Sequence, residues 1–206
     1  MTLWTIQPEE LYDSILQTGI YICDPQRFSM PEFTEMYDWL AAQMKERIGP
    51  PPRGVVYPVW AWYQNRGKRQ KLDLRSERWA NGSAGDKFVC LEIEVPDEQV
   101  LLSDFNAWEL ILLDALISET EAEDIEQEQI YQALSPDQQR EMKYENWKRV
   151  FDLTPLDNAW IRRGYWIQAN FWILTSDMIK KVRYFTAAGH KDNLREDLTE
   201  NIAQTY

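Results

Sequence analysis

The sequence predicts an α+β fold: one domain in which a mixed, twisted β-sheet, either continuous or split, is flanked by helices. The chain has 206 residues, a length that suits one domain with a single sizeable core. Two aromatic-rich stretches, at 57–64 and 165–173, indicate strands of that sheet, and the first of them alternates with period two. Stretches with helical spacing separate the strands, and no internal repeat or low-complexity linker divides residues 1–206.

The stretch YPVWAWYQ, at 57–64, is the strand around which the other elements are expected to pack. Alternation places Trp60 and Trp62 on one face and Tyr57 and Tyr63 on the other. Large aromatic side chains on both faces predict a strand that is covered on both sides. Pro58 cannot donate to a sheet ladder, so the strand is expected either to lie at an edge of the sheet or to be bulged near its start.

Local signals predict the remaining elements. Helices are expected after Pro8, which suits a first helical turn, and after Ser29. Ser103 or Asp104 is expected to cap a further helix, so Asp104 is interpreted as a structural residue rather than a catalytic acid. The other predictions are strands at 3–6, 87–95 and 182–186, an acidic helical insertion at 118–150 that is broken where Ser135 caps and Pro136 opens a helix, and a polar C-terminal helix or tail at 191–206.

Charge and composition exclude several classes of function. The formal net charge is −12, which opposes binding to long nucleic acid or to an anionic membrane surface. The chain has neither an apolar run of about 20 residues nor a secretory leader, so a cytoplasmic protein is expected. His190 is the only histidine, and Cys23 and Cys90 form no CxxC motif, so neither a metal site nor a disulfide framework is predicted.

Two charged segments stand out. The first is a predicted long loop at 65–86, where basic residues gather in an acidic chain: Arg66, Lys68, Arg69, Lys71, Arg75 and Arg78. This loop either binds a phosphate-bearing ligand or is solvated surface. The second is 118–141, with eight acidic residues and one arginine, which is either a solvated face, a mimic of nucleic-acid charge or a surface that docks on a basic protein partner.

Three stretches carry a resemblance to a known family. They are LWTIQ at 3–7, GPPPRGVVYPVWAWYQ at 49–64 and EIEVPDEQVLLSDFNAW at 92–108. Together they resemble a family of small bacterial proteins that is known only as a domain of unknown function. The resemblance covers nearly the whole chain and implies no activity.

The two ends of the chain carry a second resemblance. LWTIQPEELYDSILQTGIY at 3–21 and WIQANFWILTSDMIKKVRYF at 166–185 are similar to the ends of the ADP-ribosyltransferase and RNA 2′-phosphotransferase superfamily. This resemblance implies that Thr5 and Gln7 contact NAD, that Tyr57 to Tyr63 supply the middle strand of the site, and that Gln168 takes the place of the catalytic glutamate. Glutamine can hydrogen-bond a ribose hydroxyl but cannot act as a base. The implied protein is therefore an ADP-ribosyltransferase-like enzyme or a degenerate relative that binds NAD or a related nucleotide.

The residue chemistry suits parts of that role. Trp60, Trp62 or Tyr63 is expected to stack on a nicotinamide ring, and Gln168 to hold the ribose. Arg75 or Arg78 is expected to hold the diphosphate in a bidentate manner. The structural alternative is that the tryptophans belong to the core, that Gln168 is an ordinary strand glutamine and that the arginines only solubilise the chain. A function of another class, a non-catalytic interaction module that uses the acidic segment, also stays open.

Overall fold

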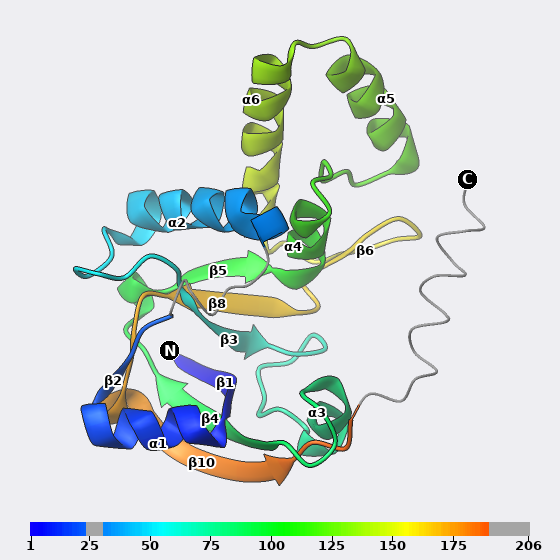
Figure 1. Ribbon diagram of the computed structural model, residues 1–206. Coiled ribbons are helices and arrows are strands. Elements are labelled where there is room, and N and C mark those ends of the chain that lie inside the picture. The colour runs from blue at the N-terminus through cyan, green and yellow to red at the C-terminus, as the bar shows by residue number, and fades with distance from the viewer. Residues whose placement is uncertain (24–30, 190–206) are drawn as a thin grey trace.

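A six-stranded sheet organises the fold, with the strand order β10-β4-β1-β3-β8-β5 (Figure 1). The computed structural model describes residues 1–23 and 31–189. Every neighbouring pair in the sheet is antiparallel, so the prediction of a mixed sheet is wrong. Periodicity within a strand reveals its faces but not its direction, which depends on partners far along the chain. The strands are β1 (Thr2–Pro8), β3 (Val59–Gln64), β4 (Lys87–Glu94), β5 (Leu101–Asp104), β8 (Ile167–Phe171) and β10 (Ile179–Thr186).

Helices cover the sheet, and two small strand pairs complete the described fold. The α-helices are α1 (Glu9–Thr18), α2 (Thr34–Ile48), α3 (Leu74–Ala80), α4 (Phe105–Leu112), α5 (Glu121–Gln132) and α6 (Pro136–Trp147). Short 3-10 helices are η2 (Pro31–Phe33), η3 (Asp97–Gln99), η4 (Lys148–Phe151) and η5 (Ser176–Met178). The small pairs join β2 (Ile20–Tyr21) to β9 (Leu174–Thr175) and β6 (Leu156–Asp157) to β7 (Arg162–Arg163).

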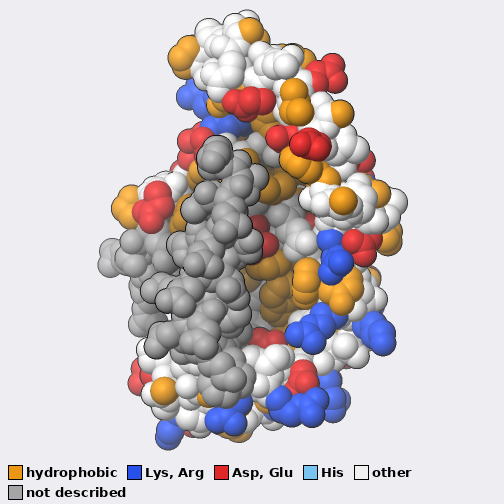
Figure 2. Space-filling view, turned by 90° about the vertical axis from the view of Figure 1, so that its right-hand side faces the viewer, with side chains coloured by type: hydrophobic (Ala, Val, Ile, Leu, Met, Phe, Trp, Pro, Cys, Tyr) orange, Lys and Arg blue, Asp and Glu red, His pale blue; other side chains and the backbone are white. Residues whose placement is uncertain are grey.

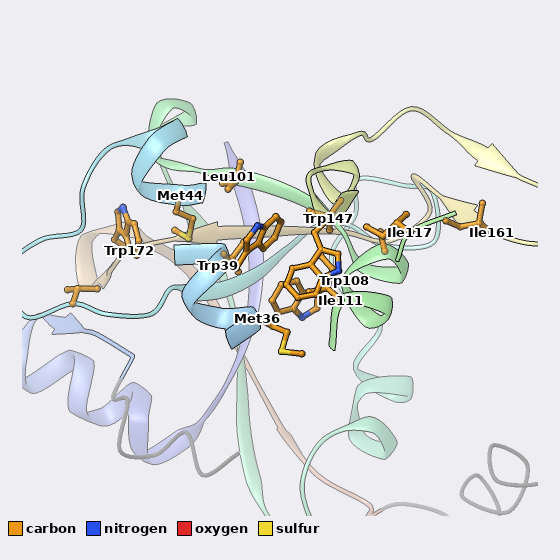
Figure 3. Packing of buried hydrophobic residues seen from close by; sticks show 14 residues of the cluster. Met36, Trp39, Met44, Leu101, Trp108, Ile111, Ile117, Trp147, Ile161 and Trp172 are labelled. Atoms are coloured by element: carbon orange, nitrogen blue, oxygen red, sulfur yellow. The ribbon is translucent and has the colours of Figure 1, made fainter. Parts of the chain in front are cut away.

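The two faces of the sheet bury different kinds of side chain. The face that packs against α1 is mainly aliphatic and includes Leu3, Leu91 and Ile93, all fully buried. The other face and helices α2, α4 and α6 share a cluster rich in tryptophan, including Trp39 and Trp147 (Figure 3). Most of the tryptophans in this second cluster are therefore core residues, because their large side chains bury extensive apolar surface.

Strand β3 confirms the predicted element at 57–64 and shows that it is interior. It lies between β1 and β8, and both of its faces are covered. Pro58 directly precedes the first ladder residue, so its missing N–H costs no sheet hydrogen bond. Neither alternative predicted from Pro58 holds, because the strand is not at an edge and its register shift lies at the other end, between Trp62 and Gln64.

The joint between β1 and β3 has fewer registered residue pairs than any other in the sheet. Its single registered pair is Trp4 opposite Trp62. One residue further on, the hydroxyl of Thr5 donates to the carbonyl oxygen of Trp60 at 2.8 Å. A side chain thus takes over where the backbone ladder between these two strands ends, and the sheet remains continuous rather than split.

Helix α3 interrupts the long loop that was predicted at 65–86. Asp73 caps this helix, since its side chain accepts a hydrogen bond from the backbone N–H of Arg75. The prediction of an uninterrupted loop is therefore wrong. The missed signal is an aspartate placed directly before LRSERWA, a run that is compatible with a helix.

The acidic segment forms a helical hairpin that stands away from the sheet (Figure 1). Helix α6 begins at Pro136 after a capping box on Ser135, as predicted. Arg149 anchors the base of the hairpin through an ion pair with Glu123 at 2.8 Å and a hydrogen bond to the carbonyl oxygen of Ile117 at 2.6 Å. The predicted tail at 191–206 and His190 lie outside the described residues. In the part of the chain that is described, no helix combines the length and apolar character needed to cross a bilayer.

Candidate functional site

A cavity of about 380 Å³ lies between the sheet and α3, and we call it the Gln168 cavity. Strands β1, β3 and β8, helix α3 and the start of α4 provide its walls. Its lining residues are Thr5, Ile6, Trp60, Ala61, Trp62, Glu77, Asn81, Phe105 and Gln168. Larger hollows exist, such as one of about 570 Å³ beside Met1 and Asp177, but that hollow contains none of the functional side chains predicted from the sequence.

Sheet register produces the wall of the cavity. Trp62 lies opposite Trp4 on one side and opposite Gln168 on the other, so the three side chains point to the same face of the sheet. The ring of Phe105 lies edge-on to that of Trp62, with 5.3 Å between the centroids. Two aromatic rings and an amide therefore converge on one wall.

Phe105 is held in place by the cap of α4. The carboxylate of Asp104 accepts from the backbone N–H of Ala107 at 3.0 Å and from that of Gly164 at 2.6 Å. Burial raises the pKa of Asp104, while these N–H donors and the nearby Arg163 oppose the rise. Asp104 is thus the predicted structural cap, and it also ties α4 to the segment that leads into β8.

Gln168 carries an unsatisfied acceptor. Its side-chain oxygen Oε1 is buried and has no hydrogen-bond partner among the described residues. Two other described residues share this feature, since the side-chain oxygens of Gln43 and Asn170 are also buried without a partner, but neither residue lines the Gln168 cavity. The Nδ2 of Asn170 donates to Ser103 Oγ at 3.0 Å and to the carbonyl oxygen of Leu101 at 3.3 Å. A buried acceptor without a donor is costly, so Gln168 is suited to accept a hydrogen bond from a bound hydroxyl or amide.

The two first-strand residues predicted to contact NAD are joined to each other. Gln7 Nε2 donates to Thr5 Oγ1 at 2.9 Å, and that hydroxyl donates in turn to Trp60 O. Thr5 lines the Gln168 cavity but is almost fully buried, whereas Gln7 does not line it. Both side chains support the joint between β1 and β3, and only Thr5 reaches the cavity.

Glu77 is a site residue that the sequence reasoning missed. It is the only carboxylate among the lining residues of the Gln168 cavity. Burial raises its pKa, while a hydrogen bond from Asn81 and the charge of Arg66 oppose the rise. Asn81 Nδ2 donates to Glu77 Oε2 at 3.4 Å and to the backbone carbonyl of Glu77 at 2.9 Å. Perturbed carboxyl groups in a cavity are typical of functional sites.

A second hollow of about 370 Å³ adjoins the first, and we call it the Arg66 hollow. The two share Trp62, Glu77 and Phe105 as walls. The other lining residues are Asn65, Arg66, Gln70, Lys71, Asp73, Ser76 and Trp166. Figure 2 shows the molecule from the side on which α3 lies; its surface is hollowed there, with hydrophobic side chains inside the hollow and Lys and Arg side chains beside it.

Besides Gln7, four of the predicted site residues lie outside the Gln168 cavity. Tyr57 donates its hydroxyl to Asp38 at 3.0 Å beneath α2, and Tyr63 packs on the aliphatic side of the sheet with Arg69 over its ring. Arg75 is exposed and paired with Asp73 at 2.7 Å. Neither Arg75 nor Arg78 lines either hollow. The sequence-predicted residues that the structure brings together are Thr5, Trp60, Trp62 and Gln168.

The arrangement favours particular chemistry. Aromatic rings can stack on a planar ligand, Gln168 can accept from a hydroxyl, Glu77 can exchange a proton, and the adjoining cations can hold an anion. Within residues 1–23 and 31–189, no group of three or more His, Cys, Asp or Glu side chains is placed to hold a metal ion.

Comparison with known proteins identifies the family but not the activity. A search of curated proteins and a search of solved structures each found no match. The resemblance to ADP-ribosyltransferases therefore stays a prediction. A family model described as Domain of unknown function (DUF3841) matches residues 2–180, which is most of the chain. The protein belongs to this family of unknown function.

Proposed function

We propose that the chain binds NAD or a related nucleotide in the Gln168 cavity and is an ADP-ribosyltransferase-like enzyme or a degenerate relative of one. The observation that carries this proposal is the buried, unpartnered Oε1 of Gln168 beside Trp62. Ribose presents hydroxyl donors and nicotinamide presents a planar ring, so one ligand of this class meets both requirements. A volume of about 380 Å³ lies within the range of small-molecule sites.

Glu77 supports the enzymatic form of the proposal. In ADP-ribosyl transfer the bond between the nicotinamide nitrogen and ribose C1′ breaks, and a nucleophilic acceptor atom bonds to C1′. The acceptor loses a proton, and the ionised carboxylate of Glu77 is the group in the cavity that is able to take it. Gln168 is then a positioning residue for the ribose. Glu77 thus offers the carboxylate that the strand at 165–173 lacks, because Gln168 stands there.

Ligand titration tests the binding step. Because Trp60 and Trp62 line the cavity, tryptophan fluorescence is expected to change saturably as NAD is added. Gln168→Leu removes the acceptor at similar volume and is expected to weaken binding about tenfold, while Gln132→Leu on the acidic helix leaves it unchanged. No saturable signal at millimolar NAD, or equal affinity in both variants, contradicts the proposal.

Product analysis tests the chemical step separately. Release of nicotinamide from NAD is measured for the natural sequence and for Glu77→Gln, which keeps the shape of the side chain but cannot accept a proton. An enzyme is expected to lose nearly all activity in this variant while NAD binding persists. Binding without any nicotinamide release identifies a degenerate relative.

A second candidate, of another class, is an interaction module that docks on a basic protein through α5. The observation that favours it is the exposure of this helix: none of its residues is buried, and Ile125 and Ile130 are about half exposed among acidic neighbours. Pull-down at low and high salt compares the natural chain with a variant carrying Glu121→Gln, Glu126→Gln and Glu128→Gln. A partner that binds the natural chain and the variant equally well, at low and at high salt, contradicts docking through acidic charge.

A further inference from the structure

Arg66 occupies an unusual backbone position at the mouth of the site. Asn65 and Lys68 exchange two backbone hydrogen bonds, of 3.0 and 3.1 Å, and so close a tight turn at the end of β3. The two central residues, Arg66 and Gly67, have φ values of 52° and 73°. Glycine and asparagine adopt this left-handed conformation readily, whereas arginine does so at a cost.

The turn is fixed in place by a further contact. The backbone N–H of Gly67 donates to the carbonyl oxygen of Tyr165 at 2.7 Å, which ties the turn to the segment that leads into β8. Arg66 is therefore presented from a braced turn rather than from a free loop. Strained backbone positions that persist in a braced segment often serve a function, and this one lines a cavity.

The side chain of Arg66 is available to a ligand. No hydrogen bond or ion pair within 4 Å joins it to another described residue, although it lines the Arg66 hollow together with Lys71. Asp73 and Glu77 line the same hollow, and the charge of Arg66 acts to lower the pKa of both carboxyl groups alongside the larger influences on them. Asp73 is held by Arg75 through Nε and Nη2, at 3.0 and 2.7 Å, and burial raises the pKa of Glu77.

We propose that the Arg66 hollow is a phosphate subsite, in which Arg66 and Lys71 hold the diphosphate of a nucleotide whose ribose and base extend into the Gln168 cavity. The ligand class is a nucleoside diphosphate or a dinucleotide. The shared walls of the two hollows give one ligand a continuous path past Trp62 and Phe105. This inference rests on the proposed nucleotide function and assigns the diphosphate to Arg66 and Lys71 rather than to Arg75 or Arg78. Arginine suits the role because its planar fork matches phosphate oxygens.

The turn itself provides a sharp test. Asparagine is favoured where Arg66 stands, so Arg66→Asn is expected to leave the melting temperature unchanged or higher. The same variant is expected to weaken ADP binding by about ten- to a hundredfold, because it removes a charged phosphate contact. Arg53→Gln, which removes the same charge from an exposed position that lines neither hollow, is the matched control and is expected to change ADP affinity little.

Three titrants separate this inference from the proposed function: ADP, adenosine and inorganic pyrophosphate, each followed by calorimetry. A subsite predicts that Arg66→Asn weakens ADP and pyrophosphate but not adenosine. If ADP binds and depends on Gln168 but not on Arg66, the inference fails and the proposed function stands. If only pyrophosphate binds and depends on Arg66, the phosphate subsite stands and the nucleotide function fails. Equal effects of Arg66→Asn and Arg53→Gln, or no binding of ADP and pyrophosphate, overturn the inference.

Discussion

Trp62 and Gln168 lie directly opposite one another on β3 and β8, so an indole ring and a buried amide oxygen without a donor share one face of the sheet. Cross-strand neighbours of this kind normally satisfy each other or a nearby backbone group. Here the indole contacts Phe105 instead, and the buried amide oxygen has no donor among the described residues although Gln168 lines the cavity. The pair offers a ligand one stacking surface and one acceptor, both set by rigid strands.

Shortening Trp62 is expected to weaken the binding of NAD. Trp62→Leu removes the stacking surface, and a loss of roughly 1–3 kcal/mol in binding free energy is expected, as for other stacked bases. Trp62→Phe keeps a ring and is expected to lose less. Calorimetry measures both affinities. Trp160→Leu, at an exposed tryptophan outside the cavity walls, is the control, and a loss as large in that variant would argue against stacking on Trp62.

Removing the hydroxyl of Thr5 is expected to destabilise the fold. Thr5→Val keeps the shape of the side chain but leaves the carbonyl of Trp60 and the amide of Gln7 without their partner. A loss of about 1–3 kcal/mol in the free energy of unfolding is expected, since these groups are partly buried. Urea denaturation measures it. Thr5→Ser restores the hydroxyl and should recover much of the loss; equal stability of the valine variant and the natural chain contradicts the bridging role.

The stability of Glu77→Gln relative to the natural chain is expected to depend on pH. Burial raises the pKa of Glu77 in the folded state above its ordinary value of 4.5, so its stabilising contribution is full below pH 4.5 and is lost as pH rises through the folded pKa. The neutral glutamine does not lose this contribution. The melting temperature of Glu77→Gln should therefore rise relative to that of the natural chain as the pH is increased from 4 to 8. A difference in melting temperature that stays constant over this range contradicts the assignment.

Removing the cap of α4 is expected to have the largest effect on stability. Asp104→Ala deletes an N-cap and leaves the buried N–H of Gly164 without an acceptor. The two losses together are expected to lower the free energy of unfolding by about 2–4 kcal/mol. Asp104→Asn keeps a side-chain oxygen for one of the donors and should lose less. Denaturant titration ranks the variants, and Asp137→Ala on the exposed hairpin should change little.

Elements with a strong local signal could be predicted from the sequence. The alternating aromatic residues after Pro58 predict β3. Asp104 predicts the start of α4, and Ser135 with Pro136 predicts the start of α6. The antiparallel arrangement could not be predicted, because strand direction depends on pairing between segments far apart in the chain. Helix α3 was missed because a seven-residue helix carries little periodicity.

The candidate site was predicted in part for the same reasons. Trp62 and Gln168 belong to two recognisable strands, but only the resemblance to the ADP-ribosyltransferase superfamily implied a common site for them, and their pairing is a finding of the structure. Glu77 could not be found, because it joins the cavity only when α3 packs over the sheet. The sequence does not show which of the basic residues at 65–86 line a cavity. In the structure, the tight turn places Arg66 in the wall of the Arg66 hollow, whereas Arg75 is paired with Asp73.

The central position of β1 has a consequence for how the chain is made. Its long ladder is with β4, in seven registered pairs that begin with Thr2 opposite Glu94, so its main partner is synthesised about 90 residues later. At typical translation rates of 5–20 residues per second, the apolar LWTI segment emerges roughly 5–20 seconds before that partner. Strand β1 therefore needs temporary cover during synthesis, and a chaperone that binds short apolar segments would find its target at residues 3–6.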